Sequence, residues 1–70
     1  MADNTYKLVE IVGTSAESFA KAAASGIERA SHSLRNLDWF EVTDMRGRIA
    51  DGHIAQYQVT MKVGFRLDEE

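Results

Sequence analysis

The chain contains no cysteine and no proline among its 70 residues. Disulfides and thiolate metal sites are therefore excluded, and the two histidines, His32 and His53, lie on different predicted elements, which argues against a structural zinc site. A domain this short buries a limited share of its unfolded surface and usually needs a crosslink, a metal or copies of itself for stability. Because the first two supports are missing, we expect a homo-oligomer.

Charge and hydropathy exclude further classes of protein. The formal net charge of −3 argues against a general nucleic-acid binder, which is usually basic. No apolar stretch is long enough to cross a bilayer, so no membrane partner is expected. The first residues hold no basic segment followed by an apolar run, so no signal peptide is expected. The lack of cysteine is compatible with a reducing compartment, and we expect a cytoplasmic protein.

The hydrophobic pattern predicts one domain over residues 1–70, in the order β-α-β-β. The predicted elements are strands over 6–12, 37–46 and 54–67, with the second strand open to extension through 49, and a helix from about 15 to about 35. Gly13 is expected to end the first strand, and Thr14 with Glu17 fits a capping box at the start of the helix. Asp51-Gly52 indicates a tight hairpin.

The predicted helix has one apolar stripe with a helical period. Its members are Phe19, Ala23, Ile27, Ala30 and Leu34, and alanines at 16, 20, 22 and 24 widen it. Small side chains there allow the helix to lie close against a sheet.

The fold class follows as α+β, with a three-stranded antiparallel sheet wrapped around one helix. The third strand alternates most cleanly, so we place it in the centre, with the helix over its apolar face. The other face is expected to be polar apart from Trp39. Both outer strands then have free edges, which invite pairing with another chain.

Trp39 is the single tryptophan, and strand alternation places it away from the helix, opposite to Phe40 and Val42. Gln58 shares its outward face on the paired strand. Further along that strand the same face carries Thr60, Lys62 and Arg66. A flat π surface, an amide and nearby cations suit a flat heteroaromatic ligand with amide-like edges. Spacing alone leaves open a tryptophan that only packs against another subunit.

Catalytic groups are not evident. Glu41 and Asp44 lie on opposite faces of a regular strand, and no candidate nucleophile has a base beside it in the sequence. We therefore expect a binding protein and not an enzyme. A structural or adaptor oligomer is the alternative function.

The residues from Tyr6 to Leu67 resemble the dodecins, small flavin-binding proteins, and in particular the bacterial branch of that family. The fragments that carry the resemblance are Val12-Gly13-Thr14-Ser15, Leu37-Asp38-Trp39-Phe40-Glu41-Val42, Arg46-Gly47, Tyr57-Gln58-Val59 and Val63-Gly64-Phe65-Arg66-Leu67. Each fragment is weak alone, but their order and the chain length make the set specific.

The resemblance implies a hollow homododecamer that stores and buffers flavins and protects against flavin photochemistry. Flavins would be held as stacked pairs between the Trp39 rings of neighbouring subunits. Gln58 would pair with the pyrimidine edge of the flavin, and Arg46 and Arg66 would lie near its phosphate. FMN is then preferred over riboflavin, and riboflavin or FAD are the alternative flavins. A small flavoenzyme is the weakest candidate function.

The resemblance also implies a second ligand, coenzyme A, near the three-fold axes of the assembly. Arg29 and Arg35 match positions implicated there, and Lys7 is a further candidate.

One residue conflicts with simple alternation. Arg46 lies seven positions after Trp39, so a regular strand would direct it to the helix side. A β-bulge near Arg46-Gly47 would return Arg46 to the outward face.

Overall fold

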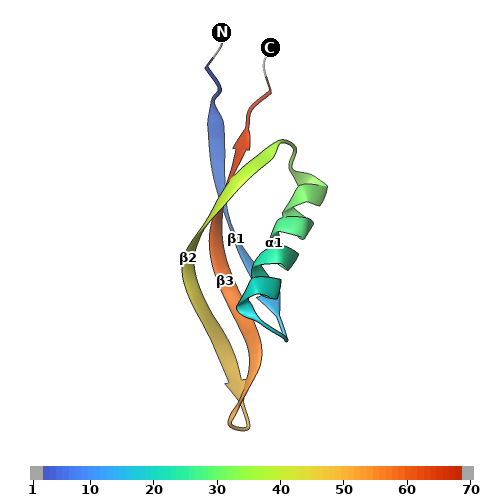
Figure 1. Cartoon of the computed structure of the whole chain (residues 1–70), viewed down its shortest axis with the longest axis vertical. Helices are drawn as coiled ribbons and strands as arrows, with labels where there is room; N and C mark the ends of the chain where they lie inside the picture. Colours follow the sequence, from blue (N-terminus) through green and yellow to red (C-terminus); the bar gives the residue numbers. More distant parts are fainter. Residues whose placement is uncertain (1–2, 69–70) are drawn as a thin grey trace.

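The computed structural model describes residues 3–68. Its elements are β1 (Tyr6–Ser15), α1 (Phe19–Ser33), β2 (Leu37–Ala50) and β3 (His53–Arg66) (Figure 1). The sheet order is β1-β3-β2 with both pairings antiparallel, which confirms the predicted topology and its central third strand. The molecule measures 56 × 20 × 14 Å, and the β2–β3 hairpin projects past the N-terminal end of α1 (Figure 1).

The hairpin turn is the one that the sequence indicates. Asp51 and Gly52 have φ angles of 52° and 77°. Two successive residues with positive φ form the turn whose twist matches that of the paired strands, and an Asp-Gly sequence favours it.

The predicted junction between the first strand and the helix is wrong. β1 continues through Ser15, and Gly13 pairs with Val59 inside the ladder. The helix is capped by Ser18, whose hydroxyl accepts a hydrogen bond from the Lys21 amide at 3.0 Å. Ser15, and not Thr14, accepts from the Glu17 amide, at 2.9 Å.

Gly13 remains in the strand because the helix passes directly over it. A Cβ atom on Gly13 would collide with the carbonyl oxygen of Ala22 and lie 3.2 Å from Cα of Gly26. Ala22 and Gly26 are accordingly the two buried residues of α1. The expected close approach of helix and sheet is therefore present, but it depends on these residues, whereas the alanines at 16, 20 and 24 are exposed.

The helix also ends earlier than expected, at Ser33 and not near Arg35. Leu34 has an extended backbone, and its amide still bonds to the Ala30 carbonyl at 2.9 Å. Asn36 then adopts a φ of 64°, and its side-chain amide donates to the Arg66 carbonyl at 3.1 Å. This turn fixes the start of β2 against the end of β3, three residues before Trp39.

The core lies between α1 and β3. Val59, Met61 and Val63 are at most 1% exposed, as the alternation of the third strand predicts. Phe19 of the helix packs edge-on against Tyr57, with ring centroids 4.9 Å apart.

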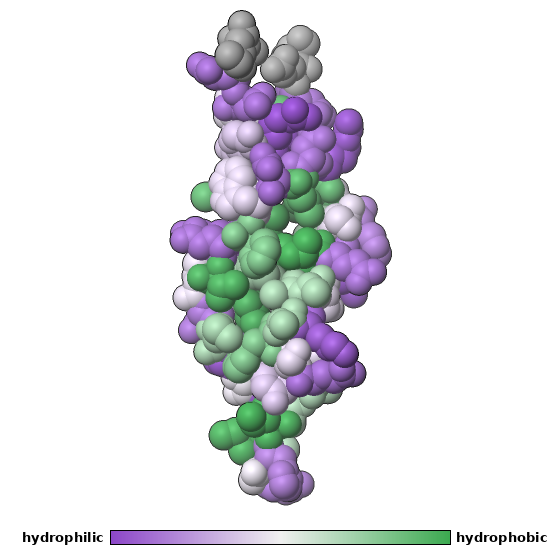
Figure 2. Space-filling view, viewed as in Figure 1, coloured by the Kyte–Doolittle hydropathy of each residue, from purple (hydrophilic) through white to green (hydrophobic). Residues whose placement is uncertain are grey.

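The helix-side face of β2 is left uncovered, because α1 packs on β1 and β3. Phe40, Val42 and Met45 are 51%, 43% and 54% exposed, so the expected burial of Phe40 and Val42 is not achieved within one chain. Figure 2 shows apolar side chains gathered over the middle of the molecule and again at the hairpin end, where Ile49 and Ile54 are exposed. Apolar surface of this extent is typical of an association surface.

Candidate functional site

Trp39 lies on the sheet face opposite the helix, where it pairs with Gly64 of β3. A Cβ atom on Gly64 would meet Cζ2, Cη2 and Cε2 of the indole at nearly equal distances, with Cε2 at 2.6 Å. Near-equal distances to three ring atoms mean that the glycine faces the plane of the ring and not its edge. The indole is therefore laid against the backbone of β3, and 42% of Trp39 is exposed.

Tyr6 of β1 reaches the same ring from the other side of β3. The Tyr6 and Trp39 centroids are 5.0 Å apart with an interplanar angle of 71°, which is an edge-to-face contact. Such pairs contribute about 0.5–1.5 kcal/mol beyond the area that they bury. Trp39 thus has Gly64 against its ring plane and Tyr6 as an aromatic neighbour, and it is still 42% exposed.

The prediction that Trp39 is the sole apolar residue of this face is wrong. By register, β1 adds Tyr6, Leu8 and Val12, which are 39%, 52% and 49% exposed. The sequence held a signal for this, because Tyr6 and Leu8 are two positions apart on one strand and therefore share a face.

A bulge brings Arg46 to the Trp39 face. The ladder shifts register between Val42 and Asp44, so Thr43 is the extra residue and Arg46 pairs with Gln58. The bulge therefore exists, three residues earlier than expected. Arg46 Nε donates to Gln58 Oε1 at 3.0 Å.

Gln56, which was not predicted as a site residue, completes this cluster. Gln58 Nε2 donates to Gln56 Oε1 at 2.8 Å. The two glutamines are separated by one residue on β3 and so share a face, a signal that was present in the sequence.

One chain does not bring the tryptophan and the glutamine together. Trp39 stands opposite Gly64, six positions along β3 from Gln58, which corresponds to about 20 Å. Arg66 lies at the Trp39 end, where it pairs with Tyr6. There it lines a polar recess of about 330 Å³ with Asn4, Tyr6, Asn36, Leu37 and Asp38. The outward face thus carries two separate half-sites, Trp39 with Arg66 and Gln58 with Arg46.

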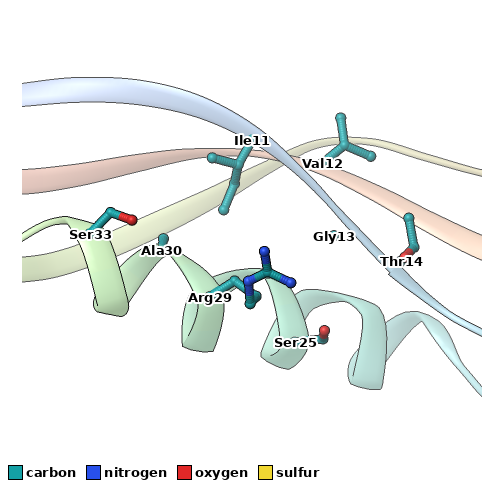
Figure 3. A pocket seen from close by; sticks show the side chains of 9 residues that line it. Ile11, Val12, Gly13, Thr14, Ser25, Arg29, Ala30 and Ser33 are labelled. Carbon is teal, nitrogen blue, oxygen red and sulfur yellow. The ribbon is translucent and has the colours of Figure 1, made fainter.

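The three cations assigned to coenzyme A are not gathered in one pocket of the chain. Arg29 extends from α1 toward β1 along a groove of about 440 Å³ between the two elements (Figure 3). The groove is also lined by hydroxyl groups from Thr14, Ser25 and Ser33. Arg35 lies beyond it and pairs with Asp68, with Nη1 and Oδ2 3.4 Å apart. Lys7 is at the start of β1, paired with Phe65, and does not line the groove.

Residues 3–68 contain no group of three histidine, aspartate or glutamate side chains placed to hold a metal ion. Within that same range, α1 is too short and too polar to cross a membrane.

Comparison with known proteins identifies the family. Residues 5–68 match the family model for dodecin. The chain is 50% identical over 64 residues to a dodecin of Thermus thermophilus, covering 91% of this chain and 93% of that protein. The solved dodecin of Streptomyces davaonensis is 59% identical, with a TM-score of 0.95 over 97% of this chain and 100% of the other.

A more distant relative has the same fold. The solved calcium dodecin of Mycobacterium tuberculosis is 28% identical, with a TM-score of 0.80 and 94% of each chain covered. Together with the observed topology, these comparisons show that the chain belongs to the dodecin family.

Proposed function

We propose that this dodecin binds flavins, with FMN preferred, and stores them without catalysing a reaction. The observation that carries the proposal is the indole of Trp39, which lies face-on against Gly64 and is 42% exposed. An isoalloxazine ring can stack on the exposed part of the indole. Stacking of one base on one aromatic ring contributes about 1–3 kcal/mol, so tight binding needs further contacts.

Other subunits supply those contacts in our proposal. The half-sites at Trp39 and at Gln58 lie about 20 Å apart in one chain, so a ligand that uses both must lie between copies. The exposed side chains of Phe40, Val42 and Met45 support assembly into a homo-oligomer, for which we propose the dodecamer. Two tryptophans from neighbouring copies would then enclose a pair of flavins.

The polar residues have distinct proposed roles. Gln58 pairs with the pyrimidine edge of the flavin through its amide. Arg46, hydrogen-bonded to Gln58, and Arg66, in the recess beside Tyr6, attract the phosphate. Two guanidinium groups on a protein with net charge −3 give a local preference for an anionic ligand, which favours FMN over riboflavin.

We further propose coenzyme A as a second ligand. The Arg29 groove offers a cation and three hydroxyl groups to a phosphate-bearing ligand. Because Arg35 and Lys7 lie outside this groove, they would act on the ligand from other copies of the chain or not at all.

Storage also suppresses photochemistry in our proposal. A stacked indole can pass an electron to the excited flavin, and rapid return of that electron dissipates the energy. Flavin fluorescence should therefore fall on binding.

The test compares the wild-type protein with Trp39→Ala by FMN titration and by size-exclusion chromatography. We expect quenching of flavin fluorescence by the wild type, no quenching by the variant, and the same oligomer for both. A purely structural oligomer predicts the reverse: no quenching by the wild type and dissociation of the variant.

A further inference from the structure

Three side chains on the outward face form a directed chain of hydrogen bonds. Arg46 Nε donates to Gln58 Oε1 at 3.0 Å, and Gln58 Nε2 donates to Gln56 Oε1 at 2.8 Å. Both glutamines are half-buried, so the pair is partly shielded from competing water.

Arg46 sets the direction of this chain. A guanidinium group has donors and no acceptor, so Gln58 must turn its carbonyl oxygen toward Arg46. The amide nitrogen of Gln58 then faces Gln56, which has to offer its own oxygen. Without an acceptor at position 56, the nitrogen of Gln58 loses the partner that opposes rotation of the amide.

The two bonds leave Gln58 with one N–H and one oxygen lone pair. We propose that Gln56 is a positioning residue. It fixes the side of the Gln58 amide on which the free N–H lies and the side on which the free lone pair lies, and so determines specificity for the ligand edge. This inference rests on the proposed flavin function. The ligand class is a flat ring whose edge carries a carbonyl and an imide N–H in fixed order.

The backbone of β2 also lies close to Gln56. A Cβ atom on Gly47 would lie 2.6 Å from the carbonyl oxygen of Gln56, so β2 passes very close to it. Because Gly47 has no side chain, β2 and β3 can approach each other here, next to the pair that Arg46 and Gln58 form across the ladder. The Gln58 amide is thus oriented by side chains at a point where the two strands approach closely.

The test uses two neutral probes, riboflavin and N3-methylriboflavin, which differ only at the imide nitrogen. Each is titrated into the wild type, Gln56→Glu and Gln56→Leu, with flavin fluorescence as the signal. Gln56→Glu retains an acceptor, whereas Gln56→Leu removes it. Gln56→Met is a second variant without an amide oxygen, in case Gln56→Leu fails to assemble.

We expect the wild type to prefer riboflavin by about tenfold, the value of one well-placed hydrogen bond. Gln56→Glu should keep this ratio within about threefold. Gln56→Leu and Gln56→Met should reduce it to about twofold, while binding of N3-methylriboflavin, which depends on stacking, stays unchanged. A merely structural role of Gln56 would weaken both probes equally.

Two outcomes overturn the inference and are distinguishable. If the wild type quenches riboflavin and its preference survives unchanged in Gln56→Leu, the positioning role is wrong and the flavin function stands. If the wild type quenches neither probe, the flavin function itself fails, and the positioning role with it.

Discussion

The indole of Trp39 lies face-on over Gly64, its partner across the β2–β3 ladder. The ring occupies the space that any side chain at position 64 would need. Glycine at this position therefore acts as part of the aromatic site, because it allows the ring to lie flat against the sheet.

Replacement of Gly64 by alanine should displace the ring. Its Cβ would overlap the indole, so Trp39 must rotate away and lose its orientation for stacking. We expect FMN binding at least about tenfold weaker, equivalent to the loss of one stacking contact, measured by fluorescence titration. Gly13→Ala is the control for a glycine-to-alanine change that strains the fold elsewhere, since its Cβ would meet Ala22 and Gly26 of the helix and not the indole. Equal FMN affinity for Gly64→Ala and wild type would refute the role of Gly64.

Gly13→Ala should destabilise the fold without a direct effect on the aromatic site. The added Cβ would meet the carbonyl oxygen of Ala22, a backbone atom that cannot move without shifting α1. We expect a loss of about 1–3 kcal/mol in the free energy of unfolding, as for other overpacked cores, measured by urea denaturation. An unchanged midpoint would show that the helix approaches β1 less closely than described.

Arg46→Ala should weaken FMN binding by removing both a cation and the hydrogen bond that orients Gln58. A hydrogen bond to a charged group contributes about 1.5–3 kcal/mol, so the loss should be about tenfold or more. Calorimetric titration gives the affinity, and Lys21→Ala on the exposed side of α1 is the control for removal of a charge. If both variants bind FMN equally well, Arg46 has no part in the site.

Met45→Glu should break the oligomer. Met45 is 54% exposed on the open face of β2, and a carboxylate buried there in an interface would lack a partner. Sedimentation velocity should show smaller species than for the wild type. Lys21→Glu, a charge change on the exposed side of α1, should sediment like the wild type. An intact Met45→Glu oligomer would place the subunit interface elsewhere.

Much of the fold could be predicted from the sequence because it depends on local patterns. The alternation of β3 gives its buried row of Val59, Met61 and Val63, and Asp51-Gly52 gives the hairpin. The junction near Gly13 could not be predicted in this way. Gly13 resembles a strand terminator, but it is needed inside the strand where Ala22 crosses it, and that crossing is a tertiary contact.

The sequence could predict which residues share the outward face but not how far apart they lie along it. Alternation places Trp39 and Gln58 on one face, but bulges set the register. Leu37 and Trp39 are two residues apart, and the shift between them places them opposite the neighbouring positions Phe65 and Gly64. The Tyr6 contact depends on pairing between β1 and β3, which is long-range. The roles of Trp39, Gln58, Arg46 and Arg66 in binding a flavin stay predictions.

The most direct measurement is the emission of Trp39 during titration with FMN. The chain has one tryptophan, so all of its indole emission reports on this site. A flavin pair enclosed by two indoles predicts a saturable loss of emission that is complete at one FMN per chain. Indole emission that stays constant at saturating FMN would contradict the stacking of a flavin on Trp39.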